Sequence, residues 1–451
     1  MITPKKKKEK VSRKKIREIL NNFKLCVELY KIIRHFFPDL IPLLKQTKDP
    51  RNPSYIKYEN YIHLFTRILA VIFQIKSMRR ITEEFNMNAC IENIRQMLGC
   101  EKLEELPHWS SINNYLEELK PEEIELILPK LCNRLIRMRS FEGSRIRNKY
   151  WQIIVDGVHL FSFKERHCQH CLTKDHKDKA GNIIWTEYYH CVLEAKLVLN
   201  GNIVCSIATE FIENETINVS KQDCERNAFY RLTSKLAQYF PKLPVCLTMD
   251  SLYACGPVFD ICKQNNWHYI IRFKDGSIPS VAKEFNVLKE MEPEQIIVKT
   301  ENSIRKEYRY VTDIPYQSHM LNIVEYIQSD LTYPFMFITD LPINKCNYES
   351  LVNDGRRRWK IENEGFNAQK NHGYELTHMF SKNDNAIKNH YLLIQIGHMI
   401  AQFIENALEL WKLIKVPSCH IAELIKQSFQ TTILSDTDIN LFNQKNQYRF
   451  P

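Results

Sequence analysis

The chain has 451 residues, of which 44% are hydrophobic and 26% are charged. It is therefore long enough to bury the cores of two or three domains, and its composition excludes an intrinsically disordered chain. Fourteen cysteines are too few for a disulfide scaffold, and there is neither a run of eighteen apolar residues nor a signal-peptide pattern. We therefore expect a cytoplasmic protein with no membrane segment.

The net charge of +10 is unevenly distributed. Nine lysines and arginines lie between Lys5 and Arg17, and a second basic cluster occupies residues 356–358. A basic arm of this kind suits a polyanion such as DNA or RNA, although a solvated, frayed terminus would carry the same charges. The second cluster lies inside the ordered chain, so it is not a tail.

Residues 1–145 are predicted to form a helical DNA-binding region that begins with the basic arm. Apolar residues recur there at helical spacing, with almost no strand signal. Within it, residues 106–119 predict a short amphipathic helix whose N-cap is Ser110 or Ser111. Such a helix could enter a DNA groove or could simply pack in a helical bundle.

The pattern changes to mixed α/β at residue 150, where strands begin to alternate with helices. Residues 146–278 are predicted to form the first part of a catalytic core, 279–346 a β-rich insertion and 347–415 the last part of the core, followed by a C-terminal helix and tail at 416–451. The strands are predicted at 150–156, 188–199, 203–211, 245–250 and 267–274, and the helices at 223–240, 254–266, 356–370 and 390–411. We expect the long apolar helix at 390–411 to pack on this core.

Two aspartates follow apolar strands. Asp156 ends the run IIVDG, and Asp250 ends VCLTMDS. Ligand groups collect at the carboxyl ends of strands in α/β sheets, so the two carboxylates could share a site. Alternatively, Asp156 could belong to a turn, and Asp250 could cap a helix that starts after Ser251.

The predicted helix at 356–370 reads RRRWKIENEGFNAQK. At about 100° per residue, Glu362 falls on the apolar stripe with Arg358, whereas Glu364 falls near the opposite face. Arg358 and Glu362 are one helical turn apart, so they form either a structural ion pair or part of a site for cations and phosphate.

These acids have a common chemical use. Two divalent ions about 3.5–4 Å apart can activate a water on one side of a phosphorus and stabilise the leaving oxygen on the other. Carboxylates suit Mg²⁺ or Mn²⁺, and Asp156, Asp250 and Glu362 are the candidate ligands. Arg358 would then contact phosphate, with Arg357 and Lys370 as further DNA-binding cations.

The order of these elements resembles the ribonuclease H-like core of DDE transposases from bacterial insertion sequences. The last motif resembles the branch that reads tyrosine, two residues, arginine, three residues, glutamate, six residues, lysine. Arg358 and Glu362 match its arginine and glutamate, whereas Gly355 stands at the tyrosine position and Gln369 at the lysine position, with Lys370 next.

The resemblance implies a transposase that binds terminal inverted repeats, cleaves DNA with two Mg²⁺ or Mn²⁺ ions and joins the 3′ hydroxyl to target DNA. It also implies a homodimer on double-stranded DNA in the bacterial cytoplasm and nucleoid. Two alternatives remain open at this point: a domesticated DNA-binding protein without catalysis, and a ribonuclease H-like nuclease that acts on other nucleic acids.

A second cluster of metal-ligand residue types follows the first strand. Cys168 and Cys171 form one C-x-x-C knuckle, and a nearby histidine or cysteine pair could complete a tetrahedral zinc site. Our preferred pair is His176 and His190, and the other residues of these types in the cluster are His167, His170 and Cys191. The alternative is a polar loop that contains cysteines without binding a metal.

Overall fold

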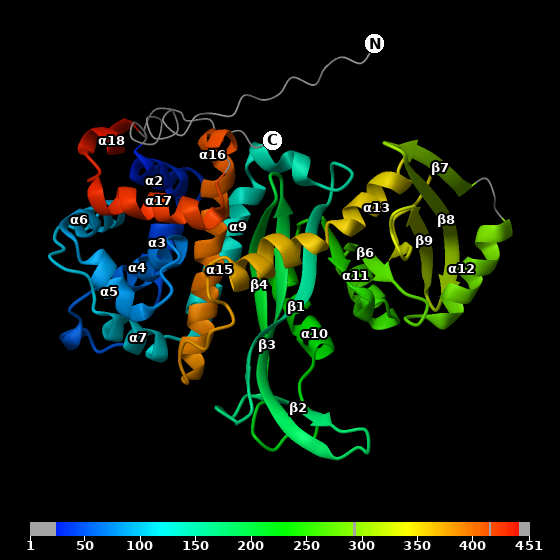
Figure 1. Cartoon of the computed structure of the whole chain (residues 1–451), viewed down its shortest axis with the longest axis horizontal. Coiled ribbons are helices and arrows are strands. Elements are labelled where there is room, and N and C mark those ends of the chain that lie inside the picture. The colour runs from blue at the N-terminus through cyan, green and yellow to red at the C-terminus, as the bar shows by residue number, and fades with distance from the viewer. Residues whose placement is uncertain (1–23, 292–294, 415, 442–451) are drawn as a thin grey trace, which may run out of the picture. The chain divides into compact units, whose positions relative to one another are not determined.

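The computed structural model describes residues 24–291, 295–414 and 416–441. The predicted basic arm between Lys5 and Arg17 lies outside these ranges, as does the end of the predicted C-terminal tail. The chain divides into two compact units, one helical and one built on a sheet (Figure 1). The predicted mixed α/β architecture with an N-terminal helical region is confirmed at this level.

The helical unit contains the described residues of 1–135, 369–376 and 383–451. Its helices are α2 (Leu25–Phe36), α3 (Leu40–Gln46), α4 (Asn60–Ile72), α5 (Met78–Phe85), α6 (Asn88–Leu98), α7 (Trp109–Glu118), α8 (Pro121–Glu125), α9 (Ile127–Ile136), α14 (Ala368–Asn371), α15 (Asp384–Ala407), α16 (Glu409–Ile414), α17 (Ser418–Thr431) and α18 (Asp436–Leu441), with a 3₁₀ turn η1 (Pro53–Tyr55). Helices α9 and α14 each have one terminal residue in the other unit.

Helix α15 is the central element of the helical unit. A Cβ at Gly397 would lie 2.5 Å from Val71 Cγ1, so the glycine permits close packing of α15 on α4. The Phe403 ring lies 4.7 Å from that of Phe36. The prediction that this apolar segment packs on the sheet core is therefore wrong: an all-round apolar helix can be buried in either unit, and its partners here are N-terminal helices.

Helix α7 is the segment considered as a groove-binding helix. It begins at Trp109, and the N-cap is His108, whose Nδ1 accepts a hydrogen bond from the Ser110 backbone. The N-cap was therefore predicted two or three residues too late. Tyr115 and Leu116 are buried, and the Leu116 carbonyl accepts a hydrogen bond from Asn389 at 2.8 Å. One face of α7 is thus occupied by packing inside its own unit.

The sheet unit spans Ile136–Ala368 and Thr377–Lys382. Its strands are β1 (Trp151–Phe163), β2 (Leu172–Lys177), β3 (Ile183–Leu199), β4 (Ile203–Ile212), β5 (Val245–Met249), β6 (His268–Phe273), β7 (Ile296–Glu301), β8 (Ile304–Tyr316), β9 (His319–Gln328) and β10 (Phe335–Thr339). Its helices are α10 (Glu225–Tyr239), α11 (Gly256–Gln264), α12 (Pro279–Met291) and α13 (Tyr348–Arg356), with the 3₁₀ turns η2 (Arg139–Ser144) and η3 (Ser251–Tyr253) and a π-helix η5 (Ile361–Asn367).

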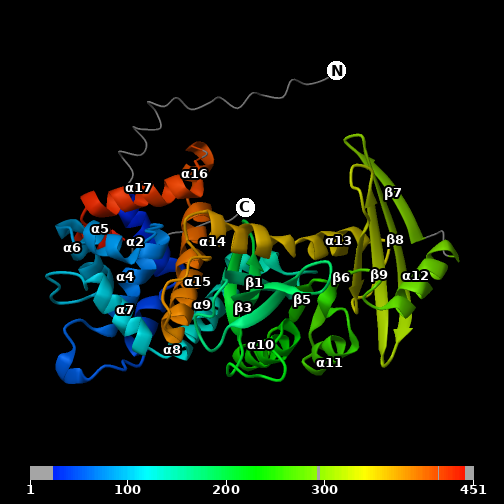
Figure 2. The same ribbon diagram turned by 60° about the horizontal axis from the view of Figure 1, so that its bottom comes forward.

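All ten strands belong to one mixed sheet. Its order is β2-β3-β1-β5-β6-β10-β9-β8-β7, and β4 pairs with β3. Strands β1, β3 and β4 are antiparallel, whereas β1, β5 and β6 are parallel. Figure 2 shows α10 and α11 on one side of these strands and α13 on the other.

The predicted insertion at 279–346 extends this sheet instead of forming a separate layer. It begins with α12, which the sequence analysis did not assign, and its last strand β10 pairs antiparallel with β6. The β-rich character was predicted correctly. Its continuity with the core depends on long-range pairing, which local patterns do not encode.

The core of this extension is a cluster of buried side chains between strands and α13. It contains Ile146, Cys246, Ile270, Tyr308, Tyr310, Val324, Tyr326, Phe337, Leu341, Ile343, Tyr348, Leu351 and Val352. Most of these residues come from β5, β6, β8, β9, β10 and α13, and Ile146, Leu341 and Ile343 come from connecting segments, so apolar burial joins the insertion to the rest of the unit.

Candidate functional site

The two predicted aspartates emerge beside each other on neighbouring strands. Strands β1 and β5 run parallel and pair up to Ile154 and Thr248. Asp156 and Asp250 each lie two residues beyond that last pair, at the carboxyl end of the parallel segment. The pairing register therefore explains why acids 94 residues apart in sequence share one edge.

Local structure around the two aspartates differs from the prediction. Asp156 does not end its strand, because β1 continues to Phe163 and pairs Asp156 with Glu194 of β3. Asp250 is the N-cap of η3, and its Oδ1 accepts a hydrogen bond from the Leu252 backbone at 2.9 Å. Asp250 therefore caps a helix, as the alternative interpretation predicted. Only its Oδ1 takes part in the cap, and Oδ2 does not.

Arg358 joins the third acid to the first. Its Nη1 donates to Asp156 Oδ2 at 2.6 Å, and its Nη2 donates to Glu362 Oε1 at 3.2 Å. The predicted i,i+4 pair with Glu362 is confirmed, and the same guanidinium reaches across to β1. We call Asp156, Asp250 and Glu362, with Arg358 between two of them, the carboxylate cluster.

Asp156 is the most perturbed member of the carboxylate cluster. Burial raises the pKa of its carboxyl to about 7, and the nearby Glu362 and Asp250 carboxylates add to this, while Arg358 opposes it. The side chain is 16% exposed. One guanidinium thus compensates only part of the crowded negative charge, so a bound cation would be favoured here.

A fourth carboxylate, which the sequence analysis missed, lies behind Asp156. Glu225 is the first residue of α10, and its Oε1 accepts a hydrogen bond from the Tyr253 hydroxyl at 2.6 Å. Its Oε2 would lie 3.0 Å from a Cβ at Gly157, so the glycine admits it. An acid in the first turn of a helix usually indicates only a favourable interaction with the helix dipole. The sequence around Glu225 therefore did not mark it as part of a functional site.

A cavity of about 270 Å³ adjoins the carboxylate cluster. It combines basic and aromatic walls, formed by Asp250, Ser251, Arg272, Lys274, Phe335, Phe337, Gly355, Arg356, Arg358 and Trp359. Nη1 of Arg272 is buried there without a hydrogen-bond partner among the described residues. An unpaired buried guanidinium donor beside three other cations is suited to a phosphate oxygen.

The other two predicted DNA-binding cations have different surroundings. Arg357 lies 3.6 Å from the carboxylate of Asp354, and Arg356, not Arg357, lines the cavity. Lys370 is partly buried in the segment Gln369–Leu376, which belongs to the helical unit. Neither residue is brought to the carboxylate cluster within the sheet unit.

Packing explains both departures from the transposase motif. A Cβ at Gly355 would lie 2.6 Å from the ring of Phe337, which leaves no room for a tyrosine at the first motif position. Gln369, at the lysine position, is fully buried and donates to Gln395 at 2.8 Å. Both positions therefore serve the interior of the protein.

The predicted single helix at 356–370 is interrupted. Helix α13 ends at Arg356, and the π-helix η5 carries Glu362. The helical-phase argument was wrong for both glutamates: the Glu362 side chain is 51% exposed, whereas Glu364 is partly buried. Burial raises the pKa of the Glu364 carboxyl, and its Oε2 has no partner among the described residues. A π-turn changes the angle between successive side chains, so phases computed for an α-helix fail there.

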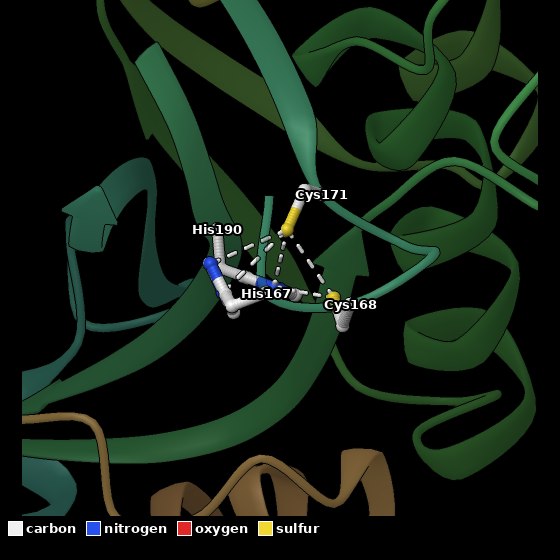
Figure 3. A group of neighbouring side chains, drawn as sticks. All are labelled: His167, Cys168, Cys171 and His190. Carbon is white, nitrogen blue, oxygen red and sulfur yellow. Dashed lines mark hydrogen bonds between the residues drawn. The ribbon is translucent and has the colours of Figure 1, made fainter. Parts of the chain in front are cut away.

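A second group of ligand-type side chains lies near the end of β1. Figure 3 shows His167, Cys168, Cys171 and His190 converging, and one ligand atom from each lies within 4.8 Å of all the others. Within the part of the chain that the structure describes, this His/Cys group is the only set of three or more such residues that meets this criterion. The hydrogen bond from Cys168 lowers the pKa of Cys171, so the pair readily shares one thiolate.

His176, which the sequence analysis offered as a zinc ligand, is not in the His/Cys group. Its Nε2 lies 2.9 Å from Glu187 Oε2, and its ring stacks on Trp185. His167 takes its place. Both histidines lie within eight residues of the two cysteines in sequence, and strand β2, which the sequence analysis did not predict, directs His176 toward β3 instead.

Comparison with models of known protein families and with curated proteins found no match to this chain. Among the described helices, none is both long enough and apolar enough to cross a membrane. The functional argument therefore depends on the geometry of the two groups and the basic cavity.

Proposed function

We propose that the chain is a DDE-type DNA transposase with a ribonuclease H-like catalytic core. It would bind the terminal inverted repeats of an insertion sequence, hydrolyse DNA phosphodiesters and join the 3′ hydroxyl ends to target DNA. The observation that carries the proposal is that Asp156 and Asp250 follow the paired segments of neighbouring parallel strands, while Arg358 joins Asp156 to Glu362 next to a cavity lined by arginines.

The sheet supports the ribonuclease H-like interpretation. Three antiparallel strands, β4, β3 and β1, adjoin two strands parallel to β1, and helices α10 and α11 connect them. The first acid lies on the central strand, the second follows β5, and the third is on a helix after the insertion. This order matches the resemblance in the sequence and gives each acid a structural position.

The carboxylate cluster fits hard divalent cations. Its donors are oxygens, and burial, together with the neighbouring Glu362 and Asp250 charges, raises the pKa of Asp156, so a cation would favour its ionised form. Mg²⁺ or Mn²⁺ held by Asp156, Asp250 and Glu362 would activate water and stabilise the leaving oxygen. The charges of both other acids act on Asp156, so it is the natural shared ligand.

The basic residues would position the substrate. Arg358 holds Asp156 and Glu362 in place and presents its charge to the cavity, while Arg272 and Arg356 would bind backbone phosphates on either side. Trp359 is 39% exposed at this cavity and offers a flat apolar surface to a base. The helical unit would contribute recognition of duplex DNA, and two copies would bring two ends together.

The test is cleavage of a supercoiled plasmid that carries the gene with its native flanking sequences. With Mg²⁺ or Mn²⁺, the full-length protein should nick or excise the insert, and Asp156→Asn, Asp250→Asn and Glu362→Gln should each abolish cleavage while preserving DNA retention in gel shifts. Glu364→Gln, two residues from Glu362 on the same helix, is the matched control and should remain active.

A specific observation favours one alternative, a DNA-binding protein without catalysis. Arg358 already neutralises parts of Asp156 and Glu362, as a purely structural ion pair would. That protein would bind the flanks equally with and without divalent metal and would not cut them. Full cleavage by any of the three acid variants would remove that residue from the proposed site.

A further inference from the structure

We propose that the His/Cys group binds one zinc ion, which fixes the loop after β1 onto strand β3. His167, Cys168 and Cys171 belong to the connection between β1 and β2, and His190 projects from β3 (Figure 3). The proposal goes beyond DNA cleavage and does not depend on it, because it rests on a different set of side chains.

The interatomic distances match a tetrahedral site. Cys168 Sγ lies 3.3 Å from Cys171 Sγ and 3.1 Å from His190 Nε2. Cys171 Sγ lies 3.7 Å from His190 Nε2 and 3.5 Å from His167 Nε2. Ligands bound to zinc at about 2.0–2.3 Å are separated by about 3.3–3.8 Å in a tetrahedron, so one ion fits among these atoms with shifts of a few tenths of an ångström.

The donor set selects the metal. Two sulfurs and two imidazole nitrogens suit Zn²⁺, and the group contributes no oxygen ligand for Mg²⁺ or Ca²⁺. All four tetrahedral positions are supplied by the protein, so no position stays open for a water or a substrate. The site is therefore structural.

Neighbouring residues hold the knuckle in its shape. Asn214 Nδ2 donates to the Cys171 carbonyl at 3.0 Å, and its backbone amide donates to the His170 carbonyl at 3.1 Å. The His170 ring in turn lies 2.8 Å from the Asn214 carbonyl oxygen, so this histidine is engaged elsewhere and is not a ligand. Hydrogen bonds of this kind orient ligands around a metal.

The surroundings of the His/Cys group are aromatic and partly buried. Cys171 is fully buried and His190 is 6% exposed, whereas His167 and Cys168 are partly exposed. The ring of Phe161 lies 5.3 Å from that of His190, and Phe163 packs edge-on against His167 at 4.9 Å. Burial limits water access to the Cys171 sulfur and strengthens its binding to a cation.

The ion would act on the ribbon that carries Asp156. His190 lies four residues before Glu194, the pairing partner of Asp156 on β3. The ribbon shifts register between His159 and Ser162, so its far end has an irregular ladder. A zinc ion would fix that end by joining β3 to the β1–β2 connection.

The decisive measurement is the zinc content of the full-length protein after dialysis against metal-free buffer. We expect about one zinc ion per wild-type chain, and at least a tenfold lower content in the Cys168→Ser/Cys171→Ser double variant. His176→Gln, in the same hairpin but engaged with Glu187, is the matched control and should keep its zinc. Less than about a tenth of a zinc per wild-type chain would overturn the proposal.

A second measurement keeps the test independent of how the variants fold. Cobalt(II) added to metal-free wild-type protein should produce the absorption bands of a tetrahedral thiolate site, and zinc should displace them. Wild-type protein that gives no such bands, or that holds Cys168 and Cys171 as a disulfide under reducing cytoplasmic conditions, would show a redox pair instead and also overturn the proposal.

Discussion

The carboxylate cluster and the His/Cys group each include a residue of the β1–β3 ribbon, Asp156 in one and His190 in the other, and they differ in almost every physical property. The cluster has hard oxygen donors, partial exposure and an arginine between two of its acids. The His/Cys group has soft donors, an aromatic shell and four converging ligand atoms. A site that must admit water and phosphate has to remain incomplete, whereas a site that only joins segments can close on its ion.

The largest expected effect is on DNA cleavage, and it should distinguish the role of the carboxylate cluster from that of the His/Cys group. Asp250→Asn keeps a cap acceptor for η3 but removes a charge, so DNA cleavage should fall at least about a thousandfold, or about 4 kcal/mol of transition-state stabilisation, with zinc content unchanged. Cys171→Ser should remove zinc and lower the melting temperature. Parallel cleavage assays, metal analysis and calorimetry check both outcomes.

If Asp250→Asn lost zinc, or if Cys171→Ser stopped cleavage without changing stability, the division of roles between the two groups would be wrong. Asp260→Asn, at an exposed position on α11 outside both groups, is the control for removal of a charge and should change neither quantity.

The next effect concerns pH and stability. The Asp156 carboxyl has a pKa of about 7 in the folded protein and about 4 when unfolded, so the native state binds more protons between these values. Its contribution to stability is present below about pH 4 and is lost as pH rises to about 7, by at most about 4 kcal/mol. Asp156→Asn should therefore stabilise the protein at pH 8 more than at pH 4.5.

Urea unfolding of both proteins across this pH range provides the measurement. Burial also raises the pKa values of Asp354 and Glu405 to about 6 and about 7, so these acids add to the pH dependence of both proteins. Only the difference in unfolding free energy between wild type and variant therefore reports on Asp156. A difference that stays constant with pH would contradict the electrostatic account. Added Mg²⁺ should reduce the difference at pH 8 by binding the ionised cluster.

A smaller effect is expected from restoring the motif tyrosine. Gly355→Tyr would drive a side chain into the ring of Phe337 and should destabilise the protein by about 1–3 kcal/mol in chemical denaturation. Gly276→Ala, where a Cβ meets nothing within 4 Å, is the control. In a Phe337→Leu background the loss of stability caused by Gly355→Tyr should be smaller. An unchanged loss would show that the strain comes from a contact other than Phe337.

The smallest effect is expected at Glu225. Glu225→Gln removes one of the charges that raise the pKa of Asp156 and keeps an acceptor for the Tyr253 hydroxyl. The pH dependence of stability should shift slightly toward lower pH, with a change in unfolding free energy below about 1 kcal/mol. A large loss of cleavage instead would identify Glu225 as a direct participant in the reaction.

The sequence predicted those parts of the site that local patterns specify. Asp156 and Asp250 follow apolar, β-branched runs, and parallel pairing of those runs places them together. Strand β2 was missed because TKDHK, its exposed stretch, shows no apolar alternation. Glu225 was missed, and His176 was preferred to His167 as a zinc ligand, because only tertiary structure distinguishes these residues from other acids and histidines of similar spacing.

The contact between Arg358 and Asp156 joins residues 202 positions apart in the chain. During synthesis, both aspartates leave the ribosome well before Arg358 and Glu362 do, so a nascent or prematurely ended chain contains only half of the carboxylate cluster. For a protein proposed to cut DNA, an incomplete translation product that ends before Arg358 would therefore lack both the third acid and the arginine that joins it to Asp156.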